Sequence, residues 1–367
     1  MLGIGAGAPQ PEHPAAFETI ALRASSPGLA GVAARGLAAL SARRFDVVLG
    51  ADWVSGALGL AWRGRSSVRQ VFAAVHDAEL DRHALRAARP IGGVYRKSRQ
   101  LVFGRFDGLL TLSPRSQTLL DDMPGARPLA IGRGCDPDRF RPLPRGALAR
   151  EHGLLDRRVL ASSGPLVPER CIDKVLFAVS ALGVRYPDLC YVVAGDGPER
   201  HRLELLAERL RIPHKVRFLG AVPDAAWPEV FNLCDVFVHL TSGSARPVDM
   251  GGAALIEAQA CAKPLVVTAQ AAAEEGVDEQ MAAIVPEDDS TALAEALSGL
   301  LDDPARARRL GEHGRQRVLV GATWDLAAER LLGAITRVAR RPRDEHARAT
   351  EAVRQRPSRA GAALVQR

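Results

Sequence analysis

Residues 192–200 read VVAGDGPER, an apolar strand that enters a glycine turn and continues directly into a helix. Pro198 stands at the first helical position and Glu199 in the first turn, where each residue favours the start of a helix. Gly195 and Gly197 allow the backbone of the turn to approach a ligand or a neighbouring segment closely. Taken alone, this stretch is best explained as a tight strand-to-helix connection without a ligand.

The same unit recurs along the chain, because short apolar runs alternate with amphipathic stretches of helical length. This alternation predicts an α/β protein with parallel sheets flanked by helices, arranged as two doubly wound domains that face each other across a cleft. The expected strands are 46–49, 70–75, 108–112, 129–131, 159–162, 190–194, 216–219, 236–240, 265–268 and 283–285. The expected helices are 29–42, 54–62, 78–103, 114–122, 172–186, 198–210, 226–231, 252–261, 290–301, 304–318 and 323–340.

Composition shifts along the chain predict the domain boundaries. The segment 143–158 is rich in charge and contains proline and glycine, which is typical of a linker. We therefore expect an N-terminal Rossmann-like domain over 1–142 and a C-terminal one over 159–322. Residues 1–27 offer no strand that runs into a glycine turn, so the chain starts late or the N-terminal sheet lacks its first strand. A helix over 323–340 is expected to pack at the domain junction, with Trp324 in a core role, followed by a basic, disordered tail over 341–367.

Length and composition fit a protein with two packed domains. The chain has 367 residues, of which 47% are hydrophobic and 25% are charged, values that exclude a disordered or fibrous protein. No apolar run approaches the ~20 residues that cross a bilayer, and the first residues do not resemble a secretory signal. The five cysteines form no CxxC pair, which predicts reduced thiols in a cytoplasmic protein without a zinc site.

The net charge of +7 is concentrated at the end of the chain, where residues 340–367 hold eight arginines against three acidic residues. A tail of this kind is typically solvated, so the sequence predicts no nucleic-acid partner. A second basic stretch, Arg86–Arg105, mixes arginines with apolar residues. It fits an ordinary amphipathic helix with one solvated face, or a face that touches anionic lipid headgroups at a membrane surface.

Residues 249–258 read DMGGAALIEA and place two acids eight positions apart around a glycine pair and a helix start. Unpaired N–H groups at the start of a helix attract phosphate, and carboxylates accept hydrogen bonds from sugar hydroxyls. Glu257 lies in an apolar helix, where a carboxylate is costly unless it has partners. Two explanations of Glu257 remain open from the residues alone: a bound ribose, or a structural hydrogen bond.

Five motifs in order resemble the C-terminal half of the family 4 retaining glycosyltransferases, which have the GT-B fold. They are GPLVPER at 164–170, AGDGPER at 194–200, FLG at 218–220, CDVFV at 234–238 and DMGGAALIEAQACAKPLVVT at 249–268. In addition, residues 131–142 resemble the segment that joins the two domains of this family, and VHD at 75–77 resembles its histidine-bearing strand end. The resemblance covers about residues 46–340.

This resemblance implies transfer of a hexose, with retention, from a nucleoside diphosphate sugar to a hydroxyl of a saccharide or lipid-linked acceptor. It implies that the transfer needs no metal and no cofactor, and that the protein works in cell-envelope glycan or glycolipid synthesis, in the cytoplasm or at the inner face of the membrane. The implied catalytic residues are His76, near the reacting sugar, and Asp249, at the sugar hydroxyls. The implied donor-binding residues are Arg170 at the diphosphate, Glu257 at the ribose, and the turn or backbone positions Gly195, Gly197, Gly251 and Gly252.

Several positions depart from the pattern of this family. Pro165 stands where an arginine is usual, Arg170 replaces a lysine, Asp249 replaces a glutamate, and 268–274 lacks the usual glycine pair. Pro165, the lost glycine pair and the absent first strand favour an alternative function, a non-catalytic GT-B scaffold that acts as a binding or partner subunit. The retained Gly195, Gly197 and Glu257, with the acidic Asp249, favour an enzyme. A third alternative, a sugar-phosphate isomerase of the same fold, has no distinguishing support in the sequence.

Overall fold

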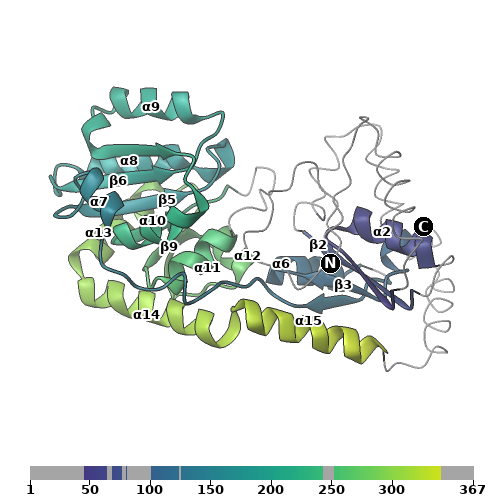
Figure 1. Cartoon of the computed structure of the whole chain (residues 1–367). Coiled ribbons are helices and arrows are strands. Elements are labelled where there is room, and N and C mark those ends of the chain that lie inside the picture. Colours follow the sequence, from purple (N-terminus) through teal and green to yellow (C-terminus); the bar gives the residue numbers. More distant parts are fainter. Residues whose placement is uncertain are drawn as a thin grey trace, which may run out of the picture.

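The computed structural model describes residues 45–63, 68–76, 80, 101–123, 125–242 and 252–339, which form two lobes side by side (Figure 1). The predicted helix 29–42, the missing first strand and the tail 341–367 lie outside these residues, as do Asp249 and Gly251. Of the basic stretch Arg86–Arg105, only residues 101–105 are described. No described helix combines the length and the apolar composition that a membrane span requires.

The N-terminal lobe contains a parallel sheet in the order β1-β2-β3-β4. Its strands are β1 (Val47–Gly50), β2 (Gln70–Val75), β3 (Gly108–Thr111) and β4 (Pro128–Ala130), and its described helices are α2 (Trp53–Arg63) and α6 (Pro114–Asp121). Helix α2 lies close to the sheet because its inner face carries glycine. A Cβ on Gly56 would stand 2.6 Å from the Cβ of Ala73, so a larger residue would push the helix off the sheet.

The C-terminal lobe contains a parallel sheet in the order β10-β9-β8-β5-β6-β7. Its strands are β5 (Arg158–Ser163), β6 (Leu189–Ala194), β7 (Val216–Gly220), β8 (Val236–His239), β9 (Leu265–Thr268) and β10 (Ala282–Val285). The order reverses between β5 and β8, which is the strand order of a doubly wound nucleotide-binding domain. In such sheets ligands bind beyond the carboxyl ends of the strands at the point of reversal.

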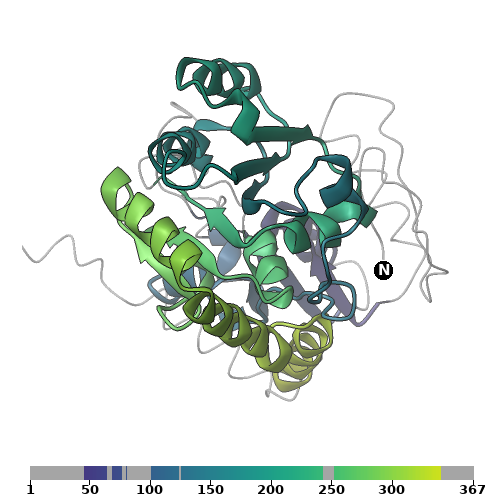
Figure 2. The same ribbon diagram turned by 90° about the vertical axis from the view of Figure 1, so that its left-hand side faces the viewer.

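Helices cover both faces of this sheet (Figures 1 and 2). One core packs under α8 (Ile172–Leu182), α9 (Arg200–Arg209) and α13 (Ser290–Asp302). The other packs under α7 (Ala147–Glu151), α10 (Trp227–Leu233), α11 (Gly252–Ala260) and α12 (Ala269–Glu275). Short 3₁₀ turns precede α8, β7 and α10: η1 (Pro168–Arg170), η2 (Pro213–Lys215) and η3 (Asp224–Ala226). Helices α7, inside the predicted linker, and α12 were not predicted.

The chain crosses between the lobes twice, and the two crossings lie side by side. Cys135 N donates to Ala322 O at 2.9 Å, and Trp324 N donates to Cys135 O at 3.2 Å. Helix α14 (Pro304–Gly321) ends at the second crossing. Helix α15 (Trp324–Ala339) follows this crossing and runs beneath the N-terminal lobe (Figure 1). There α15 closes a small core with Phe72, Leu110 and Ile131.

The expectation that Trp324 lies in a core is wrong, because the side chain is 61% exposed. One edge of the indole covers the first crossing, where a Cβ on Gly134 would stand 2.5 Å from the ring. The other side of the ring faces solvent. Trp324 therefore packs on the bare backbone of the crossing instead of entering the core.

The glycine turn after β6 is explained by a close backbone crossing. Gly195 has φ +139°, and a Cβ there would stand 2.0 Å from Gly164 O, while one on Gly197 would stand 2.5 Å from Leu166 O. Leu166 N also donates to Asp196 O at 3.0 Å, so the turn after β6 lies against the segment after β5. Both glycines are therefore needed for the backbone to pack at the carboxyl edge of the sheet.

We expect Gly195→Ala to lower the free energy of unfolding by ~2–4 kcal/mol, since it adds a backbone clash to an unfavourable conformation. Gly153→Ala is the matched control, because Gly153 also has positive φ (+64°) but has open space around its Cβ position. That control should cost only ~1 kcal/mol. Urea unfolding measures both, and equal losses in the two variants would contradict the close crossing.

Candidate functional site

Arg170 and His239 meet where the strand order of the C-terminal sheet reverses. Arg170 ends the 3₁₀ turn η1, which follows β5, and His239 is the last residue of β8. Both side chains are buried, each 4% exposed, and Arg170 Nη1 lies 2.8 Å from His239 Nε2. The fold thus brings a buried cation to the edge of the sheet where a doubly wound domain binds its ligand.

The protonation of this pair follows from its burial. Desolvation and the neighbouring guanidinium hold the pKa of His239 well below its ordinary value, so the imidazole is neutral. Its Nε2 lone pair then accepts the hydrogen bond from Arg170 Nη1. Burial also lowers the pKa of Arg170, opposed by the negative charge of Glu274. A guanidinium keeps its charge in proteins, so Arg170 remains a cation.

Arg170 has hydrogen-bonding capacity that the protein does not use. Its Nε and Nη2 atoms are buried and have no hydrogen-bond partner within the described ranges. A buried cation with unpaired N–H groups destabilises a fold unless a ligand pairs with it. The two free N–H groups suit an anion with paired oxygens, such as a phosphate.

His239 was not among the predicted site residues. It lies within the run Val236 to Leu240, whose other residues are apolar and which the sequence explains simply as a buried strand. The available signal was the position of a titratable side chain at the carboxyl end of a central strand, which is where ligands bind in parallel sheets.

Glu257 lies on α11 with a half-buried side chain. Burial raises the pKa of its carboxyl to about 7. The positive charge of Arg139 opposes this rise, and the negative charge of Asp224 adds to it. Arg139 is itself engaged, because its Nη2 lies 2.8 Å from Asp224 Oδ2. No hydrogen bond or ion pair reaches the Glu257 carboxylate from the described residues. The structural hydrogen bond, one of the two explanations left open above, is therefore not found there.

Stability should depend on pH through Glu257. A carboxyl whose pKa rises from 4.5 to about 7 on folding binds more protons in the native state than in the unfolded state. The free energy of unfolding should therefore fall as the pH rises from about 4.5 to about 7, by on the order of 3 kcal/mol at most. Glu257→Gln should remove this part of the pH dependence in urea unfolding. If the free energy of unfolding changes equally with pH in the parent protein and in Glu257→Gln, the raised pKa of Glu257 is contradicted.

The start of α11 faces a carboxylate of the protein itself. A Cβ on Gly252 would stand 2.1 Å from Glu275 Oε1, and the same oxygen lies 3.4 Å from Arg133 Nε. Glu275 and its neighbour Glu274 belong to α12, the helix that occupies the place of the expected glycine pair. Neither residue was predicted to belong to the site.

His76, the predicted residue of the N-terminal lobe, directly follows β2. It is half-exposed, and its Nε2 lies 3.0 Å from Ala51 O, which follows β1. The side chain therefore lies at the carboxyl edge of the N-terminal sheet, the edge where ligands bind. Among the residues that the structure describes, no three His, Cys, Asp or Glu side chains are grouped in a way that could hold a metal ion.

The folded lobes resemble solved structures with the GT-B fold. The structure of HepE from Anabaena in complex with UDP matches with a TM-score of 0.70 and 18% sequence identity, over 87% of this chain and 85% of that one. Sucrose-phosphate synthase from Thermosynechococcus elongatus matches with a TM-score of 0.68 and 21% identity, over 89% and 86% of the two chains. The predicted fold class, α/β with two Rossmann-like GT-B domains, is thereby confirmed.

Similar sequences carry glycosyltransferase names. Over 203 residues the chain is 32% identical to a GDP-mannose-dependent alpha-(1-6)-phosphatidylinositol monomannoside mannosyltransferase of Mycolicibacterium smegmatis, covering 54% of this chain and 53% of that protein. It thus spans about half the length of this relative. Over 307 residues it is 30% identical to a D-inositol 3-phosphate glycosyltransferase of Stackebrandtia nassauensis, covering 79% and 68%. The family model described as "Glycosyl transferases group 1" matches residues 146–317. On these matches, and in agreement with the motifs in its sequence, the chain belongs to the glycosyl transferases group 1 family.

Proposed function

We propose that this protein is a glycosyltransferase that moves a hexose from a nucleoside diphosphate sugar to a hydroxyl acceptor, with retention and without a metal ion. The observation that carries the proposal is the buried guanidinium of Arg170, which has two N–H groups without a hydrogen-bond partner among the described residues. It lies at the point of strand reversal in a sheet of the doubly wound order. Family membership supports the same chemistry.

Arg170 would bind the donor diphosphate and stabilise it as the leaving group. In sugar transfer from such a donor, negative charge grows on the diphosphate as the bond to the sugar breaks. A fixed cation in a site shielded from water stabilises this charge without reorganisation. Its rigid planar fork of N–H donors can bind two phosphate oxygens side by side, a fixed geometry that the single nitrogen of a lysine does not offer. His239 would hold the guanidinium in place through Nη1, leaving Nε and Nη2 for the phosphate.

The remaining donor contacts are proposed from the resemblance together with the described geometry. Glu257 would accept hydrogen bonds from the ribose hydroxyls, which fits a half-buried carboxylate without a protein partner. Asp249 would contact the sugar hydroxyls, and the backbone at Gly251 and Gly252 would meet phosphate or sugar. His76 would face the reacting sugar from the N-terminal lobe. The turn residues Gly195 and Gly197 complete the proposed donor-binding set.

The acceptor is proposed to be a saccharide or a lipid-linked sugar in the synthesis of cell-envelope glycans or glycolipids. The name of the Mycolicibacterium relative includes a phosphatidylinositol mannoside acceptor. We place the reaction in the cytoplasm, with peripheral contact at the inner face of the membrane through Arg86–Arg105. Flotation with anionic liposomes at low salt should carry the protein upward, and failure to float would remove the membrane contact from the proposal.

Titration calorimetry with UDP, GDP and ADP, followed by their sugar conjugates, tests the proposed function. We expect one nucleoside diphosphate to bind and its sugar conjugate to be consumed, with release of the diphosphate, when acceptor is supplied. Binding without turnover of any sugar conjugate would favour the second candidate, a non-catalytic GT-B binding or partner subunit. Pro165, at a position where a phosphate-binding arginine is usual, favours that candidate. Absence of binding would reject the nucleotide site.

A further inference from the structure

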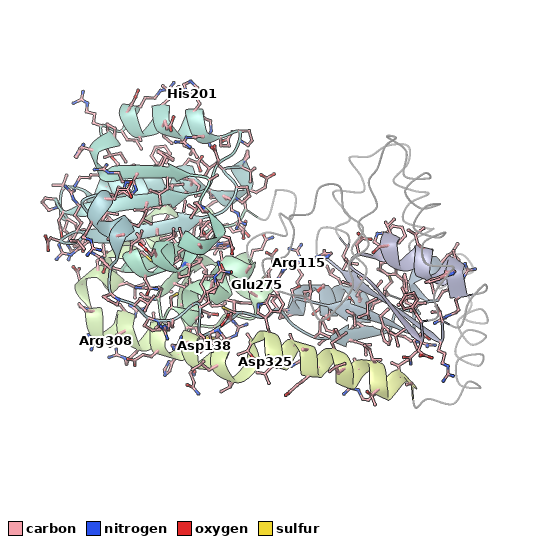
Figure 3. The ribbon with its side chains drawn as sticks, in the orientation of Figure 1. Arg115, Asp138, His201, Glu275, Arg308 and Asp325 are labelled. Atoms are coloured by element: carbon pink, nitrogen blue, oxygen red, sulfur yellow. The ribbon has the colours of Figure 1, made fainter. Side chains whose placement is uncertain are left out.

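Helix α12 connects the two lobes through an ion pair. Arg115 of α6, in the N-terminal lobe, donates a hydrogen bond from Nη1 to Oε1 of Glu274 on α12, in the C-terminal lobe. The next residue of α12, Glu275, pairs with Arg133 of the first crossing between the lobes. Arg115 and Glu275 both lie at the junction of the lobes (Figure 3). The helix that replaces the expected glycine pair therefore bears one contact to the N-terminal lobe and one to the crossing between the lobes.

The ion pair between Arg115 and Glu274 is held by its surroundings. Gln270 Nε2 donates to Glu274 Oε1 at 2.9 Å, which fixes the carboxylate. The side chains of Arg115 and Glu274 are 30% and 21% exposed, so water screens their attraction less than that of a fully exposed pair. Arg317 Nη2 donates to Glu275 O at 2.5 Å and ties the end of α12 to α14.

The same carboxylate also acts on the proposed donor site. Helix α12 directly follows β9, which pairs with β8, and the last residue of β8, His239, contacts Arg170. Glu274 therefore lies at the same edge of the sheet as Arg170, and its negative charge raises the pKa of Arg170 against the effect of burial. Glu274 is thus within electrostatic reach of two arginines, one in each lobe. If Arg115 were lost, an uncompensated carboxylate would remain near the cation that is proposed to bind the diphosphate.

We propose that Arg115 and Glu274 are positioning residues, whose ion pair clasps the two lobes together and screens the Glu274 charge from the donor diphosphate at Arg170. The part of this inference that concerns the donor rests on the proposed function; the clasp itself does not. The adjacent crossings at residues 131–135 and 321–324 form the covalent connection about which the lobes can rotate. A noncovalent contact between the lobes beside these crossings can limit that rotation.

Distances between spin labels on the two lobes test the clasp without any ligand. Val54→Cys on α2 and His201→Cys on α9 supply labelling sites in the two lobes, since both side chains are exposed. The native cysteines are all buried, and burial raises the pKa of Cys135 and Cys261 to about 12, so they react slowly. The distances are read by pulsed dipolar spectroscopy.

We expect Arg115→Ala and Glu274→Ala to lengthen and broaden the distance distribution between the lobes. The charge-exchanged double variant, Arg115→Glu with Glu274→Arg, should restore it. Arg158→Ala is the matched control, because the pair of Arg158 with Asp188 lies within the C-terminal lobe, and it should leave the distribution unchanged. Unchanged distances in both single variants, or no restoration in the double variant, would overturn the clasp.

Steady-state kinetics with the donor identified by calorimetry test the coupling to Arg170. Arg115→Ala should raise the KM for the nucleotide sugar about five- to tenfold and leave kcat near that of the parent protein, because Arg115 does not touch the donor. An unchanged KM would overturn the coupling. If no variant binds any nucleotide, the proposed function fails, and the distances alone decide the clasp.

Discussion

Replacing Arg170 by methionine is expected to weaken the binding of a nucleoside diphosphate by about 30- to 5,000-fold, the usual cost of removing one partner of a buried charged contact, ~2–5 kcal/mol. Methionine fills a similar volume, so the loss would report the missing N–H donors and not a cavity. Arg170→Lys keeps the positive charge without the fork and should lose less. Calorimetry measures the nucleotide affinity of the parent protein, Arg170→Met and Arg170→Lys.

The same substitution should have the opposite effect on stability. In the unliganded protein Arg170 is a buried cation with two N–H groups that have no hydrogen-bond partner in the described part of the chain. Removing the cation relieves a desolvation penalty larger than the cost of leaving His239 Nε2 without its donor, so Arg170→Met should raise the free energy of unfolding by ~1–2 kcal/mol. Arg158→Ala, at the opposite, amino end of β5, is the control for the binding measurement. Weaker binding together with lower stability would indicate that Arg170 is merely structural.

Glu257→Ala is expected to reduce nucleotide binding by about 100-fold or more, since two hydrogen bonds from ribose hydroxyls to a carboxylate contribute ~3–5 kcal/mol together. The fold should stay intact, because no described residue depends on this carboxylate for a hydrogen bond. Calorimetry measures the nucleotide affinity, and far-ultraviolet circular dichroism checks that the fold is intact. Glu312→Ala, at an exposed position on α14, is the control. Unchanged affinity in Glu257→Ala would remove the residue from the ribose site.

The affinity should also depend on pH through the same carboxyl, whose pKa lies at about 7. Only the ionised form accepts both hydroxyl hydrogen bonds, so the affinity should rise between about pH 6 and pH 8. A nucleotide sugar is the suitable probe, because neither of its phosphates carries a terminal group that titrates in this range. The rise should be absent in Glu257→Gln, and an equal rise in both proteins would contradict a role of Glu257.

The strands of both sheets could be predicted from the sequence, because each is a short, mainly apolar run, and central strands such as β3, β6 and β8 are buried along their whole length. Strands β2 and β9 have the predicted bounds. The other described strands differ from theirs by one residue, at both ends in β1, β4 and β5 and at one end in the rest. The glycine turn at 195–197 could also be predicted, since glycine followed by proline at the end of a strand is a local signal of a tight turn into a helix. The order of the strands within each sheet was not predicted; the sequence predicted only the doubly wound arrangement.

The ion pair between Arg115 and Glu274 could not be predicted from sequence patterns. The two residues lie 159 residues apart, and neither belongs to a motif that indicates its partner. Helix α12 was missed because its alanine-rich segment stands where the resemblance implies a glycine pair. His239 was missed because an apolar strand already explained its neighbours. In each case the information lies in which distant segments the fold brings together.

A crystal structure of the protein with the nucleoside diphosphate selected by calorimetry tests the central claim most directly. We predict phosphate oxygens about 3 Å from Nε and Nη2 of Arg170, and ribose hydroxyls at the same distance from the Glu257 carboxylate. A nucleotide bound elsewhere, or one whose phosphates leave both Arg170 atoms without contact, would contradict the account.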